Sequence, residues 1–124
     1  MAVVLTSVGE EVLIDLIDGT SGTHLTTTNS FIGWGTGAGT AAKGDTTLFT
    51  EASEARVNPS TQTQPTADKL RWVGTITANG SKTITNAGLF NASTGATLII
   101  HGDHTGQAVA LNDKIEYTIE LEQT

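Results

Sequence analysis

A length of 124 residues fits a single domain over residues 1–124, because a second hydrophobic core would leave each half too small to be stable. Six basic against thirteen acidic residues give a net charge of −7, which argues against direct binding of nucleic acid or of an anionic membrane surface. The absence of cysteine excludes disulfides and thiolate metal sites, and no 18-residue apolar stretch is present that would span a membrane.

The composition favours β-structure. Threonine is abundant, and its β-branched side chain suits a pleated strand better than a helix. Residues 1–5 are apolar but lack the basic residues and the longer apolar core of a secretory signal. We therefore expect folding in a reducing cytoplasm, and we interpret the glycosylation-like patterns at Asn79 and Asn91 as turns.

One helix is predicted, over residues 8–18, with Thr6 or Ser7 as its N-terminal cap and Gly19 as its stop. Apolar residues recur at helical spacing, so one stripe is expected to pack on a sheet face while the acidic side chains stay in water. The stripe comprises Val8, Val12, Leu13, Leu16 and Ile17, and the acids are Glu11, Asp15 and Asp18.

A buried strand is predicted at residues 31–35, between the loops 19–30 and 36–44, which are rich in Gly, Thr and Ser. The glycine run at 33–44 invites comparison with a phosphate-binding loop, but it contains neither GxGxxG nor GxxxxGK[ST]. We interpret it as a surface loop in which glycine permits positive φ.

The next segment is predicted to be mostly irregular. Asp45 is expected to cap a short turn at 46–49, and a second strand is expected at 55–57. Residues 58–68 are polar, contain both prolines and are predicted to form an extended loop or arm.

The β-pattern is strongest in the second half of the chain. Residues 69–90 are predicted to form a hairpin around an Asn-Gly turn at 79–80. Further strands are predicted at 97–101, 107–111 and 114–122, and the last of these alternates most regularly. The side chains expected to face inward are Leu70, Trp72, Ile76, Ile115, Tyr117, Ile119 and Leu121.

Regularly spaced short strands without helical crossovers favour antiparallel sheets over parallel ones. The sequence therefore predicts an all-β fold, an antiparallel β-sandwich of jelly-roll or Greek-key type with one short N-terminal helix that covers a sheet face. The acidic outward face of residues 114–122 would discourage edge-to-edge pairing.

The densest polar cluster is His101-Gly102-Asp103-His104. Two imidazoles and a carboxylate are potential metal ligands, but a zinc site needs three or four ligands in tetrahedral geometry. The only further histidine is His24, in a distant loop. We favour a structural loop over a metal site.

Catalysis has no specific support in the sequence. The GxSxG pattern of a nucleophile elbow is absent. Paired carboxylates could come from Glu51 and Glu54, which are expected to bracket Arg56 in a local ion pair, or from the last strand, whose acids point outward. We assign no catalytic, cofactor-binding or metal-binding residue, and we predict that the chain is not an enzyme.

Four segments cover most of the chain in a definite order: TSVGEEVLIDLIDG, FIGWGTGAGTAAKGDTTLFTEASEARV, ITNAGLFNASTGATLIIHGDH and LNDKIEYTIELE. Together they resemble a group of small bacteriophage structural proteins encoded among head and tail genes. Members of this group are regarded as capsid decoration proteins or tail-fibre-like proteins, so the resemblance implies a virion component without catalytic or cofactor residues. In these proteins an acidic residue often stands where this chain has Asn86, so no salt bridge is carried over to that position.

We expect a decoration, or cement, protein that is made in the bacterial cytoplasm and binds the major capsid protein on the outer surface of a bacteriophage head. Packaged DNA would repel a surface with a net charge of −7 inside the head. Such proteins commonly associate as trimers, and closed symmetry favours a homotrimer. Residues 1–5 and 58–68 are the expected intersubunit contacts, since each has backbone groups to pair and little local core.

The nearest alternative is a tail-fibre or tail-tip module that contacts host glycan or protein, with Trp34 and Tyr117 as stacking platforms, although core packing is expected for both. A third hypothesis is a small metal-dependent hydrolase that uses His101, Asp103 and His104. Stoichiometric zinc in the purified protein would favour the hydrolase, whereas density at capsomer surfaces would favour decoration.

Overall fold

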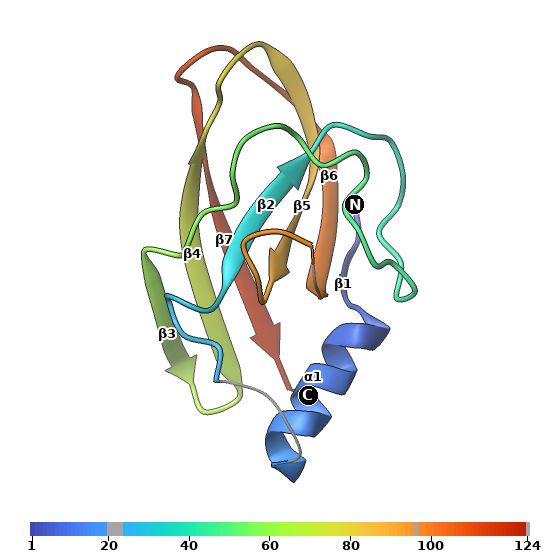
Figure 1. Ribbon diagram of the computed structural model, residues 1–124, viewed down its shortest axis with the longest axis vertical. Helices are drawn as coiled ribbons and strands as arrows, with labels where there is room; N and C mark the ends of the chain where they lie inside the picture. The colour runs from blue at the N-terminus through green and yellow to red at the C-terminus, as the bar shows by residue number, and fades with distance from the viewer. Residues whose placement is uncertain (20–23, 96, 124) are drawn as a thin grey trace.

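Two antiparallel sheets and one short helix, α1 (Ser7–Asp18), make up the regular structure in the described part of the chain (Figure 1). The computed structural model describes residues 1–19, 24–95 and 97–123. The four-stranded sheet has the order β1 (Val3–Leu5), β6 (Leu98–Val109), β5 (Lys82–Phe90) and β2 (Phe31–Gly35). The three-stranded sheet has the order β3 (Thr61–Thr66), β4 (Lys69–Thr77) and β7 (Lys114–Glu122). The predicted all-β, sandwich-like fold with one N-terminal helix is confirmed.

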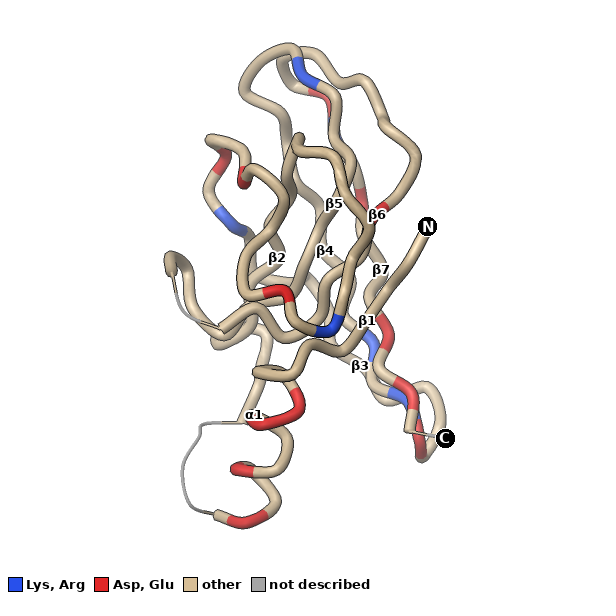
Figure 2. Tube along the Cα trace, turned by 90° about the vertical axis from the view of Figure 1, so that its right-hand side faces the viewer, with Lys and Arg blue, Asp and Glu red and all other residues tan. Residues whose placement is uncertain are grey.

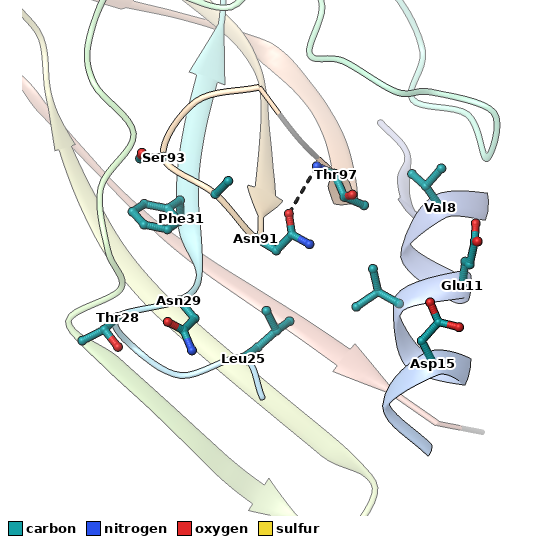
Figure 3. Close-up of a pocket in the computed structure, with 12 residues that line it drawn as sticks. Val8, Glu11, Asp15, Leu25, Thr28, Asn29, Phe31, Asn91, Ser93 and Thr97 are labelled. Atoms are coloured by element: carbon teal, nitrogen blue, oxygen red, sulfur yellow. Dashed lines mark hydrogen bonds between the residues drawn. The ribbon is translucent and has the colours of Figure 1, made fainter. Parts of the chain in front are cut away.

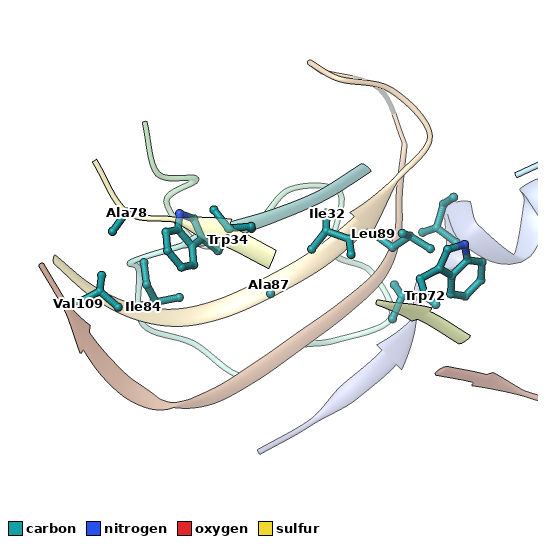
Figure 4. Close-up of a cluster of buried hydrophobic side chains, with 11 residues drawn as sticks. Ile32, Trp34, Trp72, Ala78, Ile84, Ala87, Leu89 and Val109 are labelled. Atoms are coloured by element: carbon teal, nitrogen blue, oxygen red, sulfur yellow. The ribbon is translucent and has the colours of Figure 1, made fainter. Parts of the chain in front are cut away.

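The inner faces of the two sheets enclose the main hydrophobic core (Figure 4). Trp34 of β2 and Trp72 of β4 come from opposite sheets and are each only 1% exposed. The alternation predicted for β4 and β7 is confirmed, because the inward residues of both strands pack on this core. Aliphatic side chains fill the space around the tryptophans, among them those of Ile32, Ile76, Ile84, Leu89 and Ile100.

The predicted hairpin over residues 69–90 is wrong, because β4 and β5 belong to different sheets. β4 pairs with β7 along all nine residues of each strand, whereas β5 pairs with β6 and β2. Burial explains the difference: residues 86–90 of β5 are buried on both faces, so this strand lies inside a sheet with cover on either side. The Asn-Gly turn at 79–80 therefore carries the chain from one sheet to the other.

One long strand replaces the two that were predicted at 97–101 and 107–111. β6 pairs with β1 along one edge and with β5 along the other. The structural loop favoured for residues 101–104 is wrong, because Gly102 lies opposite Val3 in a regular antiparallel ladder. Polar side chains are tolerated inside β6 because they find hydrogen-bond partners on the outer side of the sheet.

Two further predictions before β4 are wrong. Residues 55–57 form no strand, and Val57 makes only an isolated bridge with Ile32 of β2. Residues 58–68, predicted as an extended loop or arm, contain β3, which is hydrogen-bonded to β4. Pro65 lacks an N–H group and is tolerated because β3 lies at the edge of its sheet.

Helix α1 has the predicted ends but not the predicted position. The Thr6 hydroxyl accepts a hydrogen bond from the Gly9 N–H at 3.0 Å, and Gly19 ends the helix with a φ of 74°. The helix stands at one end of the sandwich and does not cover a sheet face (Figure 1). Gly9 is buried, whereas Ile14 and Ile17 are 63% and 85% exposed. The predicted burial of Ile17 is therefore wrong.

Residues 36–50, which we call the covering loop, pack on the outer face of the four-stranded sheet. Leu48 forms a second buried cluster there with Phe90 and Leu98. A Cβ atom at Gly35 or Gly37 would lie within 3 Å of the Phe49 carbonyl oxygen. Close packing against the covering loop therefore explains these two glycines, and not the positive φ that the sequence suggested.

Candidate functional site

Strand β6 separates the polar residues that the metal hypothesis requires to converge. The His101 and Asp103 side chains bond to the covering loop, whereas His104 Nε2 lies 2.9 Å from the Tyr117 hydroxyl of β7. His24 lies in the segment before β2, where its carbonyl accepts a hydrogen bond from an asparagine side chain. Within residues 1–19, 24–95 and 97–123, no three His, Asp or Glu side chains are grouped as metal ligands.

A buried polar network joins β6 and β5 to the covering loop. His101 is fully buried, with Nδ1 2.7 Å from Asp45 Oδ2 and Nε2 3.0 Å from Asn86 Oδ1. The Asn86 amide also accepts from the Phe49 N–H and donates to the Phe49 carbonyl, each at 3.0 Å. Because the side chain both accepts from and donates to the Phe49 backbone, it must carry a donor as well as an acceptor. An ionised carboxylate can only accept. Asn86 therefore suits this site better than an aspartate would.

Asp103 ties two other segments to β6. Its Oδ2 accepts the Ala41 N–H at 2.7 Å and the Ala2 N–H at 3.2 Å, and the N-terminal ammonium lies 3.9 Å from Oδ1. The Ala41 N–H, together with that of Ala2, holds the pKa of Asp103 below its usual range. Asp103 thus anchors β1 and the covering loop.

The predicted ion pair of Arg56 with two glutamates is half correct. Arg56 makes a bidentate pair with Glu51, at 2.8 and 2.9 Å. The guanidinium carbon also lies 3.4 Å from the centre of the Phe90 ring, and Nη1 donates to the carbonyls of Ala92 and Gly95. Arg56 therefore holds the turn after β5 onto the sheet.

Glu54 bonds elsewhere and forms a second anchor. Its carboxylate accepts from Lys82 at 2.5 Å, from the Asn79 N–H at 2.9 Å and from Trp34 Nε1 at 3.0 Å. Burial alone would raise the pKa of Glu54, but the bonds from Lys82, Asn79 and Trp34 outweigh it and lower the pKa to about 2. This cluster ties the segment after β2 to β2, to β5 and to the turn between β4 and β5.

We expect Glu54→Gln to lower the free energy of unfolding by about 1–2 kcal/mol at neutral pH. Because the pKa of Glu54 is lowered in the folded protein, its stabilisation is complete above the ordinary value of 4.5 and is lost as the pH falls toward 2. Urea unfolding of both proteins from pH 7 to about pH 2 should show the stability difference narrowing below pH 4.5. Glu116→Gln, on the exposed outward face of β7, controls for the loss of one charge. A difference that stays constant with pH would contradict the assignment.

Neither aromatic side chain proposed as a stacking platform is presented to solvent as an open ring face. Trp34 is 1% exposed, and its indole N–H is bonded to Glu54. Tyr117 is half-buried, and burial raises its pKa above the usual range. The stacking role is therefore wrong for Trp34, and core packing is confirmed for it.

One flank of α1 borders a polar cleft of about 730 Å³ (Figure 3). The opposite wall is formed by the segments before β2 and after β5, where the Thr97 N–H donates to Asn91 Oδ1. The cleft offers carboxylates, amides, hydroxyls and one aromatic edge, a set that suits hydrogen bonding more than catalysis. Its principal lining residues are Val8, Glu11, Asp15, Asn29, Phe31 and Asn91.

The other flank of α1 borders an apolar groove of about 600 Å³, which we call the helix groove. Ile14 and Ile17 stand exposed on its helical side. Sequence periodicity missed this surface because it treated Ile17 as buried and gave Ile14 no role. The available signal was Gly9. Because glycine has no side chain, it lets the helix approach the sheet closely at its start but does not anchor it through side-chain contact. Apolar residues that line the groove are Leu5, Leu13, Ile14, Ile17, Leu70 and Leu121.

No family model matches the chain, and no curated protein matches its sequence. None of the helices within the described residues is long and apolar enough to cross a membrane.

Proposed function

We propose that this chain is a virion structural protein, a decoration protein that binds the outer surface of a bacteriophage head and stabilises it. One observation carries the proposal: α1 presents Ile14 and Ile17 to water beside the helix groove. A small domain gains nothing in isolation from an apolar surface of this kind, which is typical of a protein that becomes covered in an assembly. The resemblance to phage head and tail proteins supports the same function.

The polar clusters support a structural role over a catalytic one. Asp45, Glu54, Arg56, His101 and Asp103 are each engaged in bonds that fix a loop or strand to its neighbour. A catalytic group needs access to substrate, and His101 is fully buried. We therefore propose that the protein acts by binding, with the major capsid protein as its partner.

Self-association into a homotrimer is part of the proposal. The outer edges of β3 and β7 have no partner strand within the described residues, so their backbone groups are available for contact with neighbouring molecules. β1, in contrast, already pairs with β6, which leaves Met1 and Val3 as the exposed side chains of the N-terminal segment. The edge strand β3 takes the place of the free arm that the sequence suggested.

The location of the protein in the particle tests this function. Cryo-electron microscopy of the phage that encodes the chain should show density shaped like the sandwich on the outer face of the capsomers. Density restricted to the tail would overturn the decoration function and favour a tail-fibre or tail-tip module. The polar cleft beside α1 would then be the surface to examine for host glycan.

A further inference from the structure

Helix α1 contacts the sandwich mainly through its first turn. The Gly9 backbone packs directly on Ile99 of β6, and the Thr6 hydroxyl bonds to the carbonyls of Leu98 and Ile99. These contacts anchor the first helical turn. Ile14 and Ile17, one turn apart on the same face, consequently extend into solvent beyond the end of the sandwich.

The exposed isoleucines are continuous with a larger apolar surface. The helix groove begins at these two residues and continues to Leu70 of β4 and Leu121 of β7, which are themselves only half-buried. The helix groove is open on one side and apolar along its floor. Such a groove can bind a ridge of apolar side chains from another molecule.

The charge on α1 restricts the kind of molecule that can insert this ridge. The helix carries four acidic residues, Glu10, Glu11, Asp15 and Asp18, and no basic one. Figure 2 shows the acidic positions in red along α1, and Lys43 of the covering loop pairs with Glu10 at 2.5 Å. Glu11 and Asp15 line the polar cleft on the other flank, whereas Glu10, Asp68 and Lys69 line the helix groove. A molecule that covers Ile14 and Ile17 therefore approaches a surface with more acidic than basic side chains.

A second copy of this chain is a poor occupant for electrostatic reasons. Two copies joined through the helix groove would bring Glu10 and Asp68 of one molecule close to the same residues of the other, with Lys69 as the basic residue that lines the groove. Like charges at such a contact oppose association unless a cation lies between them. A basic partner, in contrast, would gain attraction at the rim and apolar burial at the centre.

We propose that the helix groove and the Ile14–Ile17 face of α1 form the surface that docks onto the capsid shell, and that they bind an apolar ridge flanked by Lys or Arg on the shell protein. The inference rests on the proposed function and assigns it a surface and a partner chemistry. It also orients the molecule, with α1 toward the shell and the turn between β4 and β5 away from it (Figure 1).

The first test uses a defined probe. A synthetic amphipathic helix of leucine with lysine on its flanks should bind the protein, with amide NMR shifts confined to α1 and the residues of the helix groove. The double variant Ile14→Gln, Ile17→Gln should weaken binding at least tenfold, because Gln keeps the helix propensity but removes the apolar contact. Binding should also weaken with added salt.

Leu111→Gln is the matched control. Leu111 is 63% exposed, as Ile14 is, but it lies beside the turn between β6 and β7, at the other end of the sandwich (Figure 1). This variant should bind the lysine peptide like the unchanged protein, and a peptide with glutamate in place of lysine should not bind. Equal loss in both variants, shifts spread over the whole surface, or self-association through α1 would overturn the proposal. Circular dichroism establishes that each variant is folded.

A second assay separates failure of this inference from failure of the proposed function. Purified heads that lack the protein should take up the unchanged chain and the Leu111→Gln variant, but not the double isoleucine variant. If the heads take up no chain at all, the decoration function is wrong, whatever the peptide result. If the heads take up the double variant as well as the unchanged chain, the function stands and the docking surface is wrong.

Discussion

His101→Leu is expected to lower the free energy of unfolding by about 3 kcal/mol. The imidazole is fully buried and bonds through both ring nitrogens, to Asp45 Oδ2 and Asn86 Oδ1. Leucine replaces the volume but leaves the Asp45 carboxylate and the Asn86 oxygen without this partner beneath the covering loop. A buried acceptor that loses its donor keeps the cost of its desolvation, which is larger than the net gain of the original bond.

The covering loop should be the first part of the structure to loosen in this variant. The Asn86 amide still bonds to the Phe49 backbone, so the loss is greatest around Asp45, whose Oδ2 also accepts the Ala42 N–H of the same loop. Amide hydrogen exchange should therefore accelerate in residues 41–49 before it does in β7. The edge-to-face contact of His101 with the Phe49 ring, with centroids 4.6 Å apart, is lost as well.

His104→Leu is the matched comparison for this prediction. His104 lies three residues along the same strand, but it is partly exposed and bonds through Nε2 to the Tyr117 hydroxyl. We expect a loss below about 1 kcal/mol, measured by urea unfolding alongside His101→Leu. Similar losses in the two variants would show that the buried network does not hold the covering loop.

The strands were predictable where the signal is local. β2 and β7 begin and end at the predicted residues, because alternation or a short apolar run bounded by turns depends only on neighbours in the chain. The partner of each strand was not predictable. β5 pairs inside the four-stranded sheet because the covering loop buries its second face, and that loop lies about 40 residues earlier in the sequence.

The polar clusters show the same limit at the level of single residues. Proximity in sequence suggested that Glu54 pairs with Arg56. In the structure Lys82 of β5 pairs with Glu54 instead, and Arg56 pairs with Glu51 and stacks on the Phe90 ring. The His-Gly-Asp-His segment suggested a loop because its composition is polar. This polar segment is tolerated in a strand because the covering loop supplies hydrogen-bond partners for it. Since the loop lies far away in the sequence, no local sequence pattern indicates those partners.

Replacing Gly9 with alanine tests the contact that leaves the helix end exposed. Two effects oppose each other. Alanine favours an isolated helix over glycine by about 1 kcal/mol, so propensity alone predicts a more stable protein. The new Cβ atom, however, would overlap the Ile99 carbonyl oxygen and lie 3.0 Å from the Ile99 Cα. These are backbone atoms that no rotamer change moves aside, so we place the steric cost at about 4 kcal/mol, above the ~1–3 kcal/mol that is typical of overpacking.

The steric cost should win, and Gly9→Ala is expected to lose about 3 kcal/mol of unfolding free energy. Gly44→Ala is the control, since a Cβ atom there meets nothing within 4 Å and its effect should stay within about 0.5 kcal/mol. Thermal and urea unfolding measure both variants, and NMR shifts of Ile99 and Thr6 report whether α1 has moved. A more stable Gly9→Ala protein would mean that helix propensity, and not the close approach to β6, governs this end of the molecule. The docking surface proposed for α1 would then lose part of its support, because the Gly9 contact and the Thr6 bonds to Leu98 and Ile99 together fix the start of the helix on β6.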